Sequence, residues 1–118
     1  MTDSANQGPP RVPVPDDDLE IAILSITFQA SDPDALLSVL SKYVVLSRNT
    51  DGCRNIDLCA SYADPTRFLL IEKWNSETHA RAHLNSSLMV EMAEGCNGIL
   101  SAAPDIDLLE GVSAHDLA

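Results

Sequence analysis

RFLLIEKWNSETHARAHLN, residues 67–85, is the stretch that decides the fold of this chain. Its first half alternates in polarity and predicts a strand, one face of which carries Glu72 and the only tryptophan, Trp74. The alternation stops at Asn75 and Ser76, which are both good helix N-caps, and an alanine-rich helical segment follows. A strand with a carboxylate and an indole therefore leads directly into a short helix with two histidines.

The composition indicates one soluble domain. The chain has 118 residues, 45% of them hydrophobic, which is enough for a single core. Seven basic and 18 acidic residues give a net charge of −11, which argues against nucleic acid and anionic membranes as partners. No apolar run is long enough to span a bilayer. Three cysteines without CxxC spacing indicate reduced thiols, so we expect a cytoplasmic protein.

The two ends of the chain differ in composition from its middle. Residues 1–18 are rich in proline and aspartate, contain no apolar signal-peptide segment, and predict a disordered N-terminal tail. Residues 19–111 carry the periodic patterns and predict one folded domain. Residues 112–118 predict a short C-terminal tail.

Apolar periodicity predicts the element order βαββααβ. The predicted strands cover residues 21–28, 53–61, 67–74 and 106–109, and the predicted helices follow start signals at 31–33, 75–76 and 85–87. The first helix is expected to bury a face formed by Leu36, Leu37, Leu40, Tyr43, Val44 and Ser47. The last helix is expected to carry its apolar stripe to Leu100 and to end at Pro104. This order is typical of an α+β, ferredoxin-like fold, in which helices cover one face of an antiparallel sheet.

Helices on one face leave the other face of such a sheet uncovered. The first and third predicted strands are largely apolar on both faces, so the uncovered face needs a partner. A second copy of the chain is the simplest partner. We therefore expect a homodimer in which the two sheets pack face to face.

Several short motifs occur together in a recognisable order. They are Ser47-Arg48, Gly52-Cys53, Asp64-Pro65, Phe68, Glu72-x-Trp74, Ser76, His83, Ser86 and Pro104-x-Ile106. In this order and spacing, over roughly residues 20–110, the chain resembles the antibiotic biosynthesis monooxygenase family of small dimeric α+β barrels. The resemblance implies oxygenation of an aromatic quinol or anthrone by O₂, without a metal, flavin or other cofactor.

That reaction needs a dry pocket, groups that stabilise an aryloxide, and a base, because a deprotonated electron-rich phenol can itself pass an electron to O₂. The alternative is a non-catalytic small-molecule-binding or structural dimer. A related branch of the superfamily degrades haem. The residues aligned with its haem site are His83, Met92 and Ser25 or Thr27, none of which matches, so this third reading is disfavoured.

Two residues are candidates for catalysis. His83 is expected to point inward from its helix, where an imidazole that titrates near neutrality could act as a base or donor. It could equally be a structural histidine. Glu72 could act as a base if it is buried, or it could pair with Arg48, Arg67 or Arg81, or cap a neighbouring element.

The candidate substrate contacts are aromatic or apolar residues expected between helices and sheet. Trp74 could stack on a planar substrate or simply close one end of the barrel. The other candidates, for which plain core is the alternative, are Tyr43, Phe68, Met89 and Met92. His79 and His83 lie four residues apart, but zinc needs three or four ligands and no further ligand lies at suitable spacing, so we expect no metal site.

Overall fold

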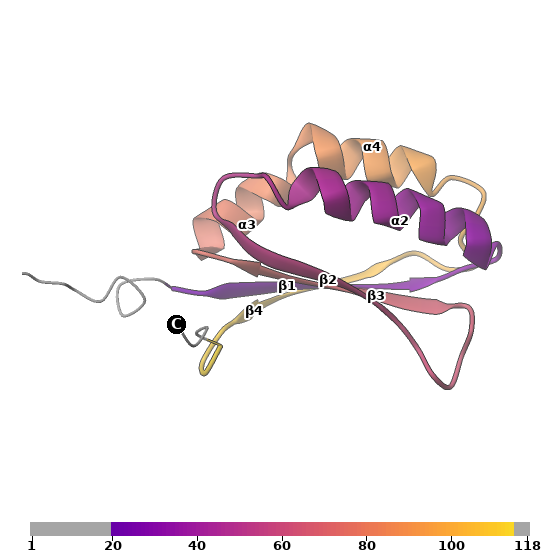
Figure 1. The fold of residues 1–118 in the computed structure, drawn as a ribbon, viewed down its shortest axis with the longest axis horizontal. Helices are drawn as coiled ribbons and strands as arrows, with labels where there is room; N and C mark the ends of the chain where they lie inside the picture. Colours follow the sequence, from indigo (N-terminus) through magenta and orange to yellow (C-terminus); the bar gives the residue numbers. More distant parts are fainter. Residues whose placement is uncertain (1–19, 115–118) are drawn as a thin grey trace, which may run out of the picture.

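The computed structural model describes residues 20–114 and confirms the predicted order of elements. The elements are β1 (Ala22–Gln29), α2 (Pro33–Ser47), β2 (Cys53–Ala60), β3 (Arg67–Trp74), α3 (Glu77–Leu84), α4 (Ser87–Gly95) and β4 (Asp105–Glu110). The strands form one antiparallel sheet in the order β2-β3-β1-β4, and all helices lie on one of its faces (Figure 1). The prediction of an α+β, ferredoxin-like fold is therefore confirmed.

Side-chain caps set the starts of the helices. Asp32 accepts a hydrogen bond from the backbone N–H of Ala35, and proline occupies the first helical position of α2. Ser76 and Ser86 cap α3 and α4 in the same way. Each cap satisfies a backbone N–H that has no partner within its helix.

Two details of the helices differ from prediction. Leu37 does not belong to the buried face of α2, because 44% of it is exposed. The last helix ends at Gly95 instead of continuing to Pro104. The chain after it turns back to the sheet, where Leu100 forms an isolated bridge with Ala30, and this pairing replaces the helical hydrogen bonds that a longer α4 would have made.

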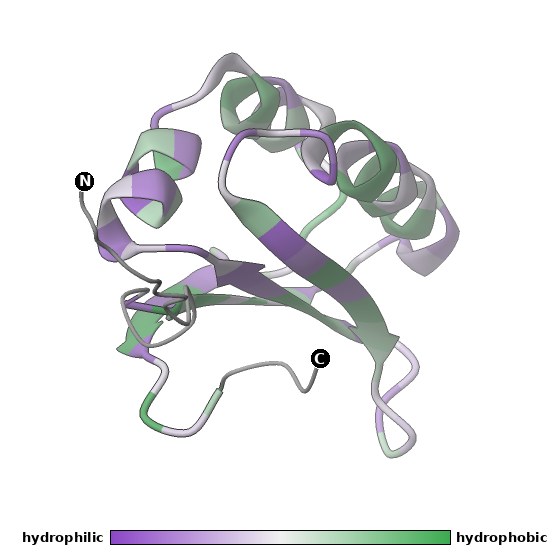
Figure 2. Cartoon of the chain, turned by 60° about the vertical axis from the view of Figure 1, so that its left-hand side comes forward, coloured by the Kyte–Doolittle hydropathy of each residue, from purple (hydrophilic) through white to green (hydrophobic). Residues whose placement is uncertain are grey.

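The core lies between the helices and the inner face of the sheet. On this face Leu24 of β1 lies opposite Glu72 of β3, and Ile26 lies opposite Leu70. These four residues are all buried. Figure 2 shows hydrophobic and hydrophilic bands alternating along β2, which is the pattern of a strand with two different faces.

The other face of the sheet, here called the open face, is not covered by any described residue (Figure 1). It carries an apolar strip: Ile71 of β3 is 37% exposed, and Leu109 of the edge strand β4 is 45% exposed. Ile23, Leu69 and Cys59 on the same face are half-buried. Asp57 and Asp107 lie on the two edge strands, so the apolar strip has an acidic rim.

Most of the two predicted tails lies outside the described residues, so their disorder stays a prediction. Residues 112–113 form a turn, and the backbone N–H of Gly111 donates to the carbonyl of Ile21. None of the helices formed by residues 20–114 is long and apolar enough to cross a membrane.

Two glycines with left-handed backbones, one before β2 and one after α4, offer a test of backbone strain. Gly52 and Gly98 both have positive φ angles, of 83° and 79°. A Cβ at position 52 would collide with the ring of His79, whereas one at position 98 meets nothing within 4 Å. We expect Gly98→Ala to cost about 1 kcal/mol of folding free energy, from the left-handed backbone alone. Gly52→Ala should cost roughly 2–3 kcal/mol. Urea denaturation measures both, and equal losses would show that His79 moves away without penalty.

Candidate functional site

Glu72 and Trp74 are two residues apart on β3, so both side chains point to the helix-covered face of the sheet. Both are fully buried, with relative exposures of 0%. β3 is an inner strand, flanked by β2 and β1, which keeps water from its inner face. A carboxyl group in such a place needs hydrogen-bond partners.

Tyr43 of α2 and His83 of α3 provide the link between Glu72 and the helices. The Tyr43 hydroxyl donates to Glu72 Oε2 over 2.6 Å, and lies 2.8 Å from Nε2 of His83. Tyr43 is 3% exposed and His83 is 1% exposed. These three side chains, from three different elements, form a continuous chain of hydrogen bonds that is called the Glu72–Tyr43–His83 network below.

Trp74 completes the cluster. Its indole Nε1–H donates to Glu72 Oε1 over 3.1 Å, so both carboxyl oxygens have a partner. The indole also packs on the imidazole of His83, with ring centroids 4.6 Å apart. Trp74 therefore satisfies the carboxyl and holds the imidazole ring at the same time.

The expectation that Glu72 might pair with an arginine is wrong. Arg48 donates to the carbonyl of Ile56, and Arg81 pairs with Glu77 on the surface. Glu72 instead takes its hydrogen bonds from neutral donors, the hydroxyl of Tyr43 and the indole of Trp74. No cation contributes a hydrogen bond to this carboxyl.

The environment shifts the pKa values of all three network residues. Burial raises the pKa of Glu72 to about 7, although the hydrogen bonds from Tyr43 and Trp74 oppose this rise. Burial, together with the Glu72 charge, raises the pKa of Tyr43. Burial lowers the pKa of His83, so the imidazole is neutral. Glu72 is thus the member of the network whose charge changes near neutral pH.

Two buried polar atoms at the network, Ser47 Oγ and His83 Nδ1, have no hydrogen-bond partner among residues 20–114. Ser47 lies close enough to the Tyr43 hydroxyl to oppose the rise of its pKa, although no hydrogen bond of acceptable geometry joins the two groups. An unsatisfied buried group costs about 1–3 kcal/mol. Such atoms are therefore places where a water molecule or a ligand group is expected to bind.

A cavity of about 440 Å³ lies between α4 and the sheet, and is called the apolar hollow. Met89 and Met92 of α4 line it, as predicted for a cavity between helices and sheet. Most of the other lining residues are apolar side chains of β1, β4 and the segment between α4 and β4, namely Ile26, Phe28, Cys96, Leu100, Pro104 and Ile106. Its size and lining suit a small aromatic molecule.

A second, smaller cavity of about 170 Å³ runs between α2 and α4 and is called the interhelical groove. Tyr43 and Met92 both line it, and the surface ion pair of Lys42 and Glu91 lies at its rim. Met92 thus borders the groove and the apolar hollow. Phe68, Trp74, Glu72 and His83 line neither cavity and are packed in the core.

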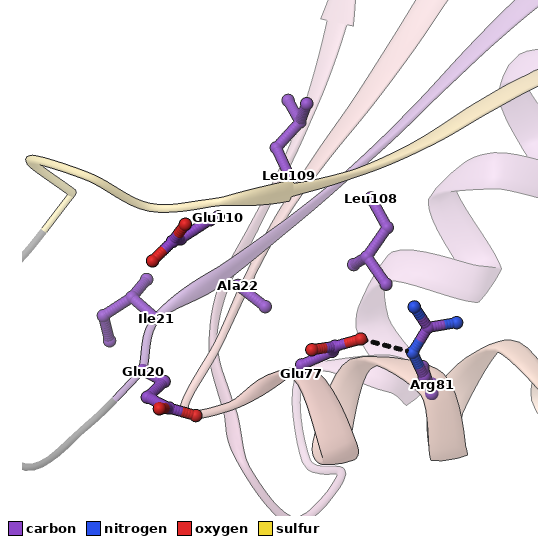
Figure 3. Close-up of a pocket in the computed structure, with 8 residues that line it drawn as sticks. All are labelled: Glu20, Ile21, Ala22, Glu77, Arg81, Leu108, Leu109 and Glu110. Atoms are coloured by element: carbon purple, nitrogen blue, oxygen red, sulfur yellow. Dashed lines mark hydrogen bonds and ion pairs between the residues drawn. The ribbon is translucent and has the colours of Figure 1, made fainter.

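A third cavity, of about 360 Å³, opens where β1 begins and β4 ends (Figure 3). Its charged side chains are Glu20, Glu77 and Glu110 with a single cation, Arg81, whose Nε donates to Glu77 over 2.7 Å. That pair is exposed and contributes little stability. An acidic rim is unfavourable for an aryloxide, so this cavity is a poor site for a phenol.

The two histidines of α3 do not act together. His79 Nδ1 lies 2.8 Å from Ser76 Oγ, and its ring is partly exposed, whereas His83 is buried. Among residues 20–114 no group of three or more His, Cys, Asp or Glu side chains is placed to hold a metal ion. The three cysteines are free thiols.

The sequence over most of this fold matches that of a known family. The family model for antibiotic biosynthesis monooxygenase matches residues 21–95, and the chain belongs to this family. No curated protein matches the sequence.

Solved structures agree with this assignment. PA3566 from Pseudomonas aeruginosa is 27% identical, with a TM-score of 0.69 over 77% of this chain and 93% of that one. NE2512 from Nitrosomonas europaea is 20% identical, with a TM-score of 0.74 over 85% and 97% of the two chains. SnoaB from Streptomyces nogalater, described as a cofactor-independent oxygenase, is 13% identical, with a TM-score of 0.68 over 76% and 91%. At 20% identity or less, likeness shows the fold alone.

Raising the pH should destabilise the protein through Glu72. The pKa of its carboxyl is about 7 in the folded protein, compared with 4.5 for an ordinary glutamate, so the folded state binds the proton more tightly. This contribution to stability is complete below pH 4.5 and is lost as the pH rises through 7. In urea denaturation, the wild type should lose roughly 3 kcal/mol of unfolding free energy between these limits through this carboxyl. The variant Glu72→Gln should not show this loss.

The exposed Glu77 provides a matched control for that measurement, because Glu77→Gln changes a carboxyl on the surface of α3. Its stability curve should run parallel to that of the wild type. If the curve of Glu72→Gln were also parallel to the wild type, the buried carboxyl would not be protonated in the folded state at neutral pH.

Proposed function

We propose that the protein is a cofactor-independent monooxygenase-like enzyme that oxidises an aromatic quinol or anthrone with O₂. The observation that carries the proposal is a buried carboxyl of near-neutral pKa, linked by hydrogen bonds to a neutral imidazole, on the same side of the sheet as an apolar hollow large enough for a small aromatic molecule. Membership of the family and the description of SnoaB support this class of reaction.

The chemistry needs no external reductant. An anthrone and O₂ give an anthraquinone and water, because the substrate loses two hydrogen atoms while one oxygen atom enters the product. The step that the protein accelerates is loss of the phenolic or enolic proton, since the resulting aryloxide passes an electron to O₂ far more readily. General-base catalysis of such a step contributes about 100-fold or more.

The residues divide into two groups in this proposal. His83 and Glu72 supply the base, and Tyr43 and Trp74 hold them in place. Met89 and Met92 contact the substrate in the apolar hollow, where flexible thioether side chains adapt to a planar ring. Phe68 contributes to the core behind the hollow, next to Phe28 in the sheet register.

The enzyme is proposed to act as a homodimer through the open face. The apolar strip around Ile71 and Leu109 is flanked by carboxylates on the edge strands, which would lie at the rim of a face-to-face contact. A partner sheet would remove these side chains from water without disturbing the helix side. The active site would lie within each protomer.

A non-catalytic binding protein is the second candidate. It is favoured by one observation: the oxygen atoms of Glu72 and Nε2 of His83 already have partners inside the protein, and neither residue lines the apolar hollow. In a binding protein, the sole role of such a closed network would be to hold α2 and α3 on the sheet. Ligands would then raise the melting temperature without turnover.

Oxygen consumption with a panel of hydroquinones and anthrones separates these candidates. We expect turnover by the wild type and about a 100-fold loss of kcat in His83→Ala, because the base is removed. His79→Ala is the matched control, since it removes the other histidine of α3, whose ring is partly exposed and which contacts none of the network residues. Thermal stabilisation by the same compounds without oxygen uptake would favour the binding protein.

Sedimentation of two aspartate variants tests the dimer. Ile71→Asp puts a charge in the middle of the open face and should shift the protein to a monomer at micromolar concentration. Val90→Asp is the control, because Val90 is an exposed valine on α4, on the opposite side of the sheet. A wild-type protein that sediments as a monomer would contradict the proposed assembly.

A further inference from the structure

In the Glu72–Tyr43–His83 network, a single hydroxyl proton lies between two possible acceptors. The Tyr43 hydroxyl has one proton, yet it lies within hydrogen-bond distance of Glu72 Oε2 and of His83 Nε2. Trp74 occupies the other carboxyl oxygen, so Oε2 is the atom that interacts with the tyrosine. All four residues are buried, and the Ser47 hydroxyl also lies near the Tyr43 hydroxyl.

With Tyr43 and His83 both neutral, and any carboxyl proton of Glu72 on Oε2, two arrangements of protons satisfy both hydrogen bonds of Tyr43. If Glu72 is ionised, Tyr43 donates to it, so Nε2 of His83 must carry a proton and donate to the tyrosine oxygen. Nδ1 is then bare. If Glu72 is protonated, its carboxyl donates to Tyr43, Tyr43 donates to Nε2, and the imidazole proton lies on Nδ1. The imidazole is neutral in both arrangements, which differ by one proton in total.

The open end of this chain is Nδ1 of His83. It is the buried ring nitrogen that has no partner in either arrangement, although the residue is 1% exposed. A proton that binds there lets Nε2 pass its own proton to the tyrosine oxygen, and lets Tyr43 pass its hydroxyl proton to Glu72. The charge that disappears is the one on Glu72, at the other end of the chain.

We propose that Nδ1 of His83 is the proton entry of a relay in which Tyr43 transfers the proton and Glu72 stores it. The identity of the proton donor, an aryl hydroxyl group, rests on the proposed function; the relay itself does not. In that reaction the substrate O–H bond breaks, its electron pair stays on the aryl oxygen, and an N–H bond forms at Nδ1. Tyr43 is then a positioning residue and makes no contact with the substrate.

The surroundings of the network suit this division of roles. The pKa of Tyr43 is raised and that of His83 is lowered, both mainly by burial, so neither is expected to hold a charge at neutral pH. The groups that face Glu72 are Tyr43 from α2, Trp74 on its own strand, Leu24 from β1 and Cys53 from β2. Burial and the Glu72 charge raise the pKa of the Cys53 thiol, so it stays neutral as well.

Nitrogen NMR of the imidazole side chains tests the relay in substrate-free protein. As the pH rises through about 7, His83 should change from the Nδ1–H to the Nε2–H tautomer while it remains neutral. Tyr43→Phe keeps the ring but removes the bridge, so the tautomer should no longer follow the pH. Glu72→Gln should abolish the change near pH 7. The signals of His79 should be the same in wild type and variants.

Three results would overturn the relay. They are an imidazolium form of His83 near pH 7, a single tautomer of wild-type His83 over the whole range, and a tautomer change that persists in Tyr43→Phe. Because these measurements need no substrate, they do not depend on turnover. A tautomer change without oxygen consumption would retain the relay and reject the proposed enzyme.

Kinetics then show whether turnover uses the relay. Tyr43→Phe should lower kcat about 100-fold, leave KM unchanged, and remove the inflection of the kcat profile near pH 7. A rise in KM with kcat unchanged would identify Tyr43 as a substrate contact and overturn its role in the relay.

Discussion

Burial of the Glu72 carboxyl is the constraint on which the inner side of this structure depends. A carboxyl group with no exposed surface must either hold a proton or find hydrogen-bond donors, and here it does both near neutral pH. Its two donors come from the same strand and from α2, and its connection to α3 runs through the tyrosine. One polar group on β3 therefore determines how two helices lie on the sheet.

The helix side of the sheet thus has a polar part and an apolar part. The polar part lies on β3 under α2 and α3, and the apolar hollow lies on β1 and β4 beside α4. Met92 borders both the hollow and the interhelical groove, and the groove is also lined by Tyr43.

The candidate site was only partly visible in the sequence. Alternation along residues 67–74 placed Glu72 and Trp74 on one face, and helical spacing placed Tyr43 and His83 on inner faces of their helices. Periodicity states which face a residue occupies, but it does not state which residue lies opposite. The sequence therefore could not show that Tyr43 bridges Glu72 and His83, and the partners suggested for the carboxyl were arginines that lie elsewhere.

The sequence by itself determined the element order, the ferredoxin-like sheet and the starts of the helices, because these follow from local periodicity and from capping residues next to each helix. Even there, the end of α4 at Gly95 depended on a distant bridge between Leu100 and Ala30. The tertiary structure alone decided that the buried polar side chains meet in a single chain of hydrogen bonds and that an apolar hollow lies between α4 and the sheet. Both depend on distances between elements far apart in the sequence, and such distances are set by packing.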